Sequence, residues 1–292
     1  MVYFAKPFRK ALWLSLEHDV PNTAKAAAFS GMLVIFPALL LLTSLMAVMP
    51  QGTTLMGEIR AGFDQFLPAD TLALMQASLQ ASHLRSAQLL LSATGISIFG
   101  GLGLMLSLME GFRRAYRLPF GEWGVWQRRM RALLLVPIVL VPLALATLLL
   151  VFGRLIETWM IVNSIHELHH IVILMWRLAR WAIAMLTSVA VLGALYHFGT
   201  KRTEHWMHVV PGAITTTLLW FPATLAFGWY MTRFADYSMV YGSFGAGIAM
   251  LVWLYITSYS VLLGAELNGV LFRARKERDA AEEDAEARSF HL

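Results

Sequence analysis

The stretch YSMVYGSFGAGIAMLVWLYITSYSVLLGA, residues 237–265, decides the fold, because it contains no Asp, Glu, Lys or Arg. A helix needs about 20 apolar residues to cross a hydrocarbon core of about 30 Å. A charge-free run longer than that predicts a membrane-spanning helix, which we place at 242–267. The polar groups within such a helix are then the first candidates for function.

Five further runs carry little or no charge. They lie at 26–49, 86–109, 132–153, about 178–200 and 209–232. The composition of the chain agrees with them: 58% of the residues are hydrophobic, 14% are charged, and the mean hydropathy is +0.61. Soluble domains are about 25% charged. We therefore predict an all-α polytopic membrane protein with six transmembrane helices in a single domain at 26–270.

Three segments flank or connect these helices. Residues 1–25 predict a cytoplasmic interfacial amphipathic helix, because Phe8, Leu12 and Leu16 recur every four residues. Residues 50–87 predict two short helices in an outer loop, and 271–292 form a charged cytoplasmic tail. The first apolar run has no plausible cleavage site, so we expect it to be retained. The chain has no cysteine, which excludes disulfides and thiol chemistry.

The distribution of basic residues predicts the orientation. Of the 23 Lys and Arg residues, 17 lie before residue 26, at 113–131, at 201–202 and after 270, against four in the alternate connecting segments. Because basic segments stay inside, both termini are predicted to be cytoplasmic. The basic excess indicates membrane lipids as partners and gives no indication of nucleic-acid binding.

The letters HELHH at 166–170 match H-E-x-x-H, in which His166 and His170 would hold zinc and Glu167 would act as general base. Such a site also needs a third ligand and a shielded open position on the metal. By the predicted topology the motif lies in a short outer loop with no evident third ligand. We interpret it as coincidental, and predict no metal, no other cofactor and no nucleotide-binding loop.

Polar groups on the last span give the strongest candidate site. Tyr255, Tyr259 and Glu266 share one helical face that leads to the inner interface, and Asn268 lies just beyond them. As a functional surface this stripe would line a cavity, with Glu266 binding a cation or a proton. In the structural interpretation, which we favour, Glu266 forms an ion pair with Arg113 or Arg114.

Other polar groups have two interpretations as well. Arg177 and Arg180, one turn apart, would be either an outer site for anionic headgroups or residues that extend their charges to the interface. Glu110 is predicted to form a local ion pair with Arg113 and Arg114 at the inner interface. The hydroxyls of the threonines at 215–217 are expected to bond to carbonyls of their own helix.

Local motifs in a fixed order also point to a family. They are Ala26-Ala27-Ala28-Phe29-Ser30, Phe36-Pro37, Ala115-Tyr116, Pro211-Gly212-Ala213, Tyr241-Gly242-Ser243-Phe244-Gly245-Ala246 and Gly264-Ala265-Glu266-Leu267-Asn268. Over about residues 10–270 the chain resembles the YihY/virulence factor BrkB family of bacterial inner-membrane proteins. The resemblance implies six spans and a cytoplasmic-membrane location. Members were once labelled ribonuclease BN, but no His/Asp cluster on the predicted cytoplasmic side is able to hold two metals.

Three classes of function follow. The leading one is transport or export of an amphiphilic or anionic envelope component by a protein that is not an enzyme. The second is a scaffold for envelope proteins, a possible homo-oligomer that associates through the small residues of the helix at 86–109. The third is the zinc metalloprotease suggested by residues 166–170.

Overall fold

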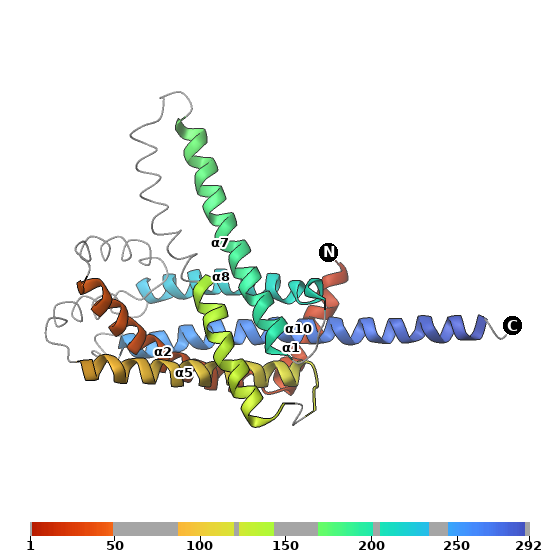
Figure 1. The fold of residues 1–292 in the computed structure, drawn as a ribbon. Helices are drawn as coiled ribbons and strands as arrows, with labels where there is room; N and C mark the ends of the chain where they lie inside the picture. Colours follow the sequence, from red (N-terminus) through yellow and green to blue (C-terminus); the bar gives the residue numbers. More distant parts are fainter. Residues whose placement is uncertain are drawn as a thin grey trace.

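The computed structural model describes residues 2–48, 87–119, 123–142, 169–200, 205–233 and 245–289, and these residues contain helices and no strand (Figure 1). The helices are α1 (Val2–Glu17), α2 (Val20–Val48), α5 (Ala87–Ala115), α7 (His169–Gly199), α8 (Val210–Arg233) and α10 (Gly245–Ser289), with a 3-10 turn η2 (Trp206–His208) and a helical segment at 125–142. The all-α prediction is confirmed for this part of the chain.

Four described helices are long and apolar enough to cross a membrane: Leu91–Ala115, Leu174–Gly199, Val210–Met231 and Gly247–Glu283. They contain most of the spans predicted at 86–109, 178–200, 209–232 and 242–267. The span predicted at 26–49 falls almost wholly in α2, and the one at 132–153 is described only as far as residue 142. Apart from Ala87, the predicted outer loop lies outside the described residues. The six-span count and the cytoplasmic termini stay predictions.

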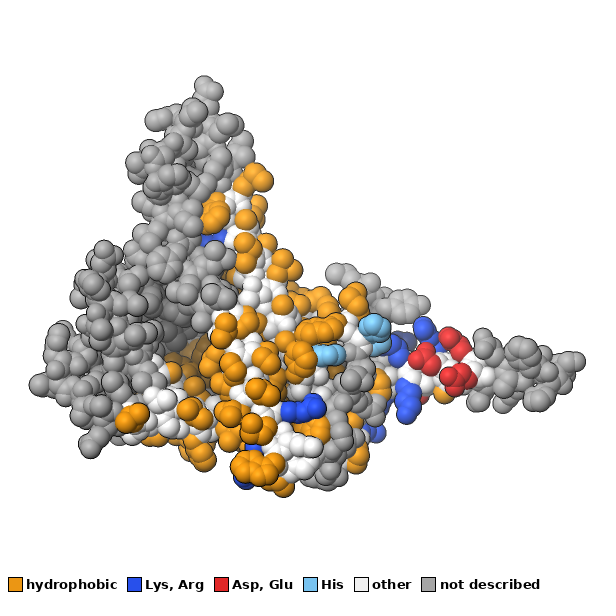
Figure 2. All heavy atoms as spheres, in the orientation of Figure 1, with side chains coloured by type: hydrophobic (Ala, Val, Ile, Leu, Met, Phe, Trp, Pro, Cys, Tyr) orange, Lys and Arg blue, Asp and Glu red, His pale blue; other side chains and the backbone are white. Residues whose placement is uncertain are grey.

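Helix α10 contacts α1, α2, α5 and α8, whereas α7 packs mainly against α8. All ten residues at 261–270 are buried, because this part of the helix lies inside the bundle. Beyond residue 273 most of its described side chains are exposed, and the helix projects from the bundle (Figure 1). Figure 2 shows acidic and basic side chains on this projection. The predicted charged tail is therefore, to residue 289, a continuation of the last helix.

Small residues let α5 pack closely against its neighbours. A Cβ atom at Gly100 would lie 3.0 Å from Leu33 Cβ, and one at Gly103 would lie 3.0 Å from Ser30 Oγ. Both neighbours belong to α2, whereas a Cβ at Gly111 would collide with Leu262 of α10. The small-residue face of α5 is thus occupied within the chain.

The connection between α1 and α2 consists of only His18 and Asp19. Asp19 has a φ of 58°, in the left-handed region that Asp tolerates better than most residues. Its carbonyl oxygen accepts the Thr23 hydroxyl at 3.1 Å. Because this turn is so short, α2 begins at Val20, ahead of the predicted start at residue 26.

One face of α1 packs on the bundle. Ala11 and Leu14 are buried against Leu263 and Leu267 of α10. On another face Trp13 is 73% exposed. Large apolar side chains are exposed along the candidate spans too, as the orange surface in Figure 2 shows. A soluble monomer rarely exposes so much apolar surface, and contact with lipid accounts for it.

Candidate functional site

A buried carboxylate lies near the middle of α10. Glu266 is fully buried, and its Oε1 lies 2.8 Å from Nδ1 of His18. The histidine reaches it because the two-residue turn between α1 and α2 packs against α10. This contact is a hydrogen bond, and it is also an ion pair whenever His18 is protonated. The predicted pairing of Glu266 with Arg113 or Arg114 is wrong.

The second carboxylate oxygen, Glu266 Oε2, is buried and has no hydrogen-bond partner among the described residues. The positive charges of Arg117 and Arg273 stabilise the ionised form of this carboxylate. A buried charged oxygen without a hydrogen bond is nevertheless costly, and a proton or a cation bound at Oε2 would relieve that cost. Trp253 Nε1 and Arg273 Nη2 on α10 are also buried without a hydrogen-bond partner among the described residues, but Glu266 Oε2 is the carboxylate oxygen among them.

The tyrosines of the predicted stripe face α1 and the bundle core. Tyr259 lies 3.2 Å, hydroxyl to hydroxyl, from Ser15 on α1. The ring centroids of Tyr255 and Tyr259 are 6.2 Å apart, and both rings pack against the core. Tyr259 and Glu266 contact α1 and the turn that follows it.

Asn268 does not belong to this stripe. Its Oδ1 accepts the backbone N–H of Gly212 at 2.8 Å, and its Nδ2 donates to the Val209 carbonyl at 3.0 Å. Two residues along a helix point in nearly opposite directions, so Asn268 faces α8 while Glu266 faces the turn. Its role is to hold the start of α8, and its assignment to the stripe was wrong.

A second polar contact joins α7, α8 and α10 through Tyr196 and Thr216, and it was not predicted from the sequence. The Tyr196 hydroxyl of α7 donates to the Val261 carbonyl at 2.7 Å and lies 2.7 Å from Thr216 Oγ1. Thr216 also donates across to the Ser260 carbonyl at 3.1 Å, whereas Thr215 and Thr217 bond to their own helix as expected. Helix periodicity places Thr216 on a face, but it does not say which helix that face meets.

Glu110 lies at the centre of a cluster of arginines on α5 and the segment at 125–142. Its carboxylate is 2.6 Å from Arg113 Nη2, 3.3 Å from Arg114 Nε and 3.0 Å from Arg128 Nη2. The first two partners come from helical spacing. Arg128 was missed, because it comes from a different segment.

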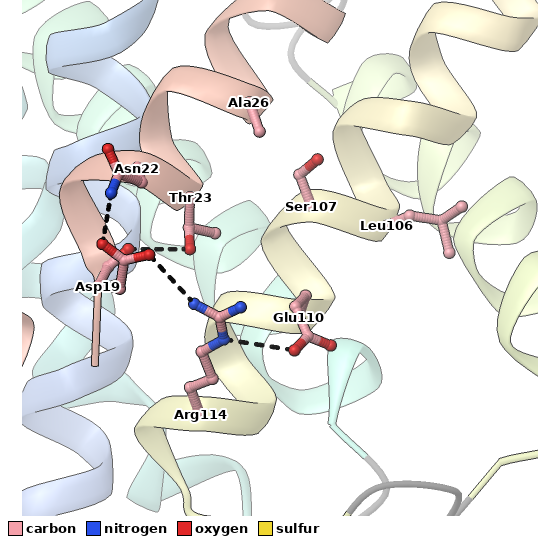
Figure 3. Close-up of a pocket in the computed structure, with 8 residues that line it drawn as sticks. All are labelled: Asp19, Asn22, Thr23, Ala26, Leu106, Ser107, Glu110 and Arg114. Carbon is pink, nitrogen blue, oxygen red and sulfur yellow. Dashed lines mark hydrogen bonds and ion pairs between the residues drawn. The ribbon is translucent and has the colours of Figure 1, made fainter.

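A hollow of about 410 Å³ opens between the start of α2 and the end of α5 (Figure 3). Asp19, Asn22, Thr23 and Ala26 line it from the α2 side, and Leu106, Ser107, Glu110 and Arg114 from α5. Arg114 joins this hollow to the buried carboxylate, because its Nη1 lies 3.4 Å from the carbonyl oxygen of His18. His18 therefore contacts Glu266 through its ring and Arg114 through its backbone.

The remaining candidates are described only in part. Arg180 is half-buried on α7, where the backbone of Arg177 lies one turn earlier. His170 is in the first turn of α7, but its side chain, like His166 and Glu167, lies outside the described residues. Within the described ranges no three His, Cys, Asp or Glu side chains gather as a metal site would require.

The comparisons with known proteins give the class. The profile of the virulence factor BrkB family matches residues 14–289, so the chain belongs to that family of membrane proteins. Among its relatives, YfkH of Bacillus subtilis, a protein named as ribonuclease-like, is 26% identical over 90% of this chain and 94% of its own.

Two further relatives are named only as UPF0761 membrane proteins. The one from Vibrio parahaemolyticus is 26% identical over 90% of this chain and 82% of its own. The one from Aromatoleum aromaticum is 26% identical over 86% of this chain, which spans only 60% of that longer relative. No solved structure matches the chain.

Proposed function

We propose that this protein moves an amphiphilic or anionic envelope component across the bacterial inner membrane, and that proton binding at Glu266 drives the movement. The protein acts as a transporter without catalysing a reaction. The observation that carries the proposal is the fully buried carboxylate on a candidate membrane span, with one oxygen on His18 and the other without a described partner. Carboxylates paired with histidines inside membranes are typical of proton relays.

The contacts around Glu266 suggest how a proton would act on the cargo. Protonation removes the negative charge that holds His18, so the turn between α1 and α2 is held less strongly. The same turn meets Arg114 at the hollow through the carbonyl oxygen of His18. Arg114 in turn contacts Glu110, so one chain of polar contacts runs from the proton site to the arginine cluster. A change at Glu266 is thereby passed to the lining of the hollow.

The test is translocation of acyl-labelled phosphatidylethanolamine and phosphatidylglycerol in proteoliposomes containing the full chain. Quenching from outside by dithionite measures how much labelled lipid reaches the outer leaflet, with and without an imposed pH gradient. We expect the protein to accelerate translocation, and the gradient to change that rate.

The decisive variant is Glu266→Gln, which keeps the shape of the side chain but cannot ionise. It should abolish the response to the gradient, whereas Glu283→Gln, an exposed substitution on the same helix, should behave as the unchanged protein. A monodisperse, helical Glu266→Gln protein that still responds to the gradient would refute the coupling. No acceleration of either lipid by the unchanged protein would refute transport of these cargoes.

A further inference from the structure

The hollow between α2 and α5 presents one cationic group to its interior. Arg114 is about one-third exposed, and its Nε and Nη1 atoms lie near Glu110, the His18 carbonyl and Asp19. A guanidinium carries five N–H donors, so these contacts leave donors available. Arg113 and Arg128 add two further positive charges behind Glu110. The α5 side of the hollow therefore suits a phosphate.

Two hydroxyls and a carboxylate of the lining can accept hydrogen bonds, while the Asn22 amide donates to Asp19 Oδ1 at 2.6 Å. Thr23 Oγ1 donates its proton to the Asp19 carbonyl at 3.1 Å, and Ser107 Oγ donates its proton to the Gly103 carbonyl at 2.9 Å. Both hydroxyl oxygens can then only accept from a ligand. Asp19 adds a carboxylate that is more than half exposed, and its Oδ2 lies 3.8 Å from Arg114 Nη1. Such a set of acceptors recognises a group rich in donors, and the carboxylate favours a positively charged one.

One side of the hollow is apolar and continues along α2. Ala26 and Leu106 line it, and Phe29, one turn beyond Ala26, is 61% exposed. The two helices close tightly beyond this point, at Gly103 and Ser30. An apolar chain attached to a bound head would therefore lie along the outside of the pair, in contact with Phe29. The hollow, at about 410 Å³, falls in the range that small-molecule sites occupy.

We propose that this hollow binds the headgroup of an aminophospholipid, with the phosphate on Arg114, the primary ammonium on Asp19, and the acyl chains along Ala26 and Phe29. The ligand is an amphiphile that carries both a phosphodiester and an N–H-bearing cation, as phosphatidylethanolamine does. As an assignment of the cargo this rests on the proposed transport, but binding itself does not require transport.

The test is native mass spectrometry of the full chain in detergent with one added lipid at a time. Three lipids with identical acyl chains show which part of the headgroup is recognised: phosphatidylethanolamine, phosphatidylcholine and phosphatidylglycerol. Phosphatidylcholine keeps the phosphate and the positive charge but has no N–H donor, and phosphatidylglycerol replaces the amine by hydroxyls. We expect retention of phosphatidylethanolamine about tenfold above the other two. Equal retention of the three lipids would overturn the proposal.

Two variants assign the contacts. Asp19→Asn should remove the preference for phosphatidylethanolamine while the left-handed turn is kept, because Asn tolerates that conformation. Arg114→Gln should weaken all three lipids. Asp279→Asn and Arg129→Gln, both exposed, are the matched controls and should change nothing. An unchanged preference in Asp19→Asn would refute the ammonium site.

A soluble competitor separates a lipid site from a site for a free headgroup. Glycerophosphoethanolamine at the concentration of the lipid should not displace it, and displacement would show that the acyl chains contribute nothing. Glu266→Gln should bind phosphatidylethanolamine normally. Normal binding of phosphatidylethanolamine without any translocation would refute transport but not the headgroup site. Translocation with no headgroup preference would refute the headgroup site but not transport.

Discussion

At the scale of single residues, neighbouring threonines on α8 differ in their hydrogen-bond partners. Thr216 donates to the carbonyl of Ser260 on α10 and lies against the buried Tyr196 hydroxyl. Thr215 donates only to the carbonyl of Pro211 on its own helix. Hydrogen bonds between membrane helices contribute about 0.6 kcal/mol on average and up to about 1.7 kcal/mol.

We expect Thr216→Val to lower the free energy of unfolding by about 1–2 kcal/mol. The isosteric side chain cannot hydrogen-bond, so the buried Tyr196 hydroxyl and Ser260 carbonyl lose this partner. Thr215→Val should cost less than about 0.5 kcal/mol, because its donor serves a single carbonyl of its own helix. Unfolding by sodium dodecyl sulfate in mixed micelles, followed by circular dichroism, measures both. Equal losses in the two variants would contradict this assignment.

Residues with chemical interest were easier to predict than their partners. The sequence marks Glu266, because a carboxylate in an apolar run is rare. It does not mark His18, because the pair lies 248 positions apart and depends on a turn through Asp19. The same limit applies to Arg128, which meets Glu110 from another segment. Local pairs such as Glu110 with Arg113 follow from helical spacing alone.

At the scale of elements, α8 and α10 approach so closely that only glycine fits between them. A Cβ at Gly264 would lie 2.6 Å from the Tyr196 hydroxyl and 2.7 Å from the Gly212 carbonyl, and would also collide with Thr216. At Gly95 on α5, by contrast, a Cβ would meet nothing within 4 Å. The two glycines are therefore a matched pair for testing the packing of helices.

Gly264→Ala should destabilise the protein by about 1–3 kcal/mol, since α8 and α10 have to separate to admit the methyl group. Gly95→Ala should be neutral or stabilise by up to about 1 kcal/mol, because Ala favours a helix. Thermal unfolding in detergent measures the difference as a shift in Tm. A stable Gly264→Ala protein would contradict the close approach.

The helices were more predictable than their ends. The apolar runs in the sequence predicted the four described candidate spans, because a helix that crosses a bilayer needs a certain length and an apolar composition. They did not place the start of α2 at Val20, since Asn22, Thr23 and Lys25 interrupt the apolar pattern there and the start depends on the Asp19 turn. Nor did they show that α10 continues to Ser289, well past Phe272, the last large apolar residue of that helix.

At the scale of the whole molecule, the number of spans and the charge bias predict the side of the membrane on which each terminus lies. We predict six spans with both termini in the cytoplasm, from the bias of basic residues. Because the chain has no cysteine, single cysteines at Lys6 and Asp279 can report each end without background. A membrane-impermeant maleimide should label neither in intact spheroplasts and both after lysis.

Labelling of only one position in intact spheroplasts would require an odd number of spans and contradict the prediction. Labelling of both cysteines in intact spheroplasts would be consistent with an even number of spans but would place both termini outside the cytoplasm. A cysteine at Gln51, in the predicted outer loop, is the positive control and should react without lysis. The same reagents therefore test the count and the direction.

The length of α10 has a mechanical consequence. It runs unbroken for 45 residues, about 68 Å at 1.5 Å per residue, and Glu266 lies almost at its midpoint. The parts of α10 before and after Glu266 are thus nearly equal in length, and residues 274–289 of the second part extend beyond the bundle. A rotation of about 10° about that midpoint would displace the charged end by about 6 Å. A change in how Glu266 is held would therefore move the exposed charged end of the same helix.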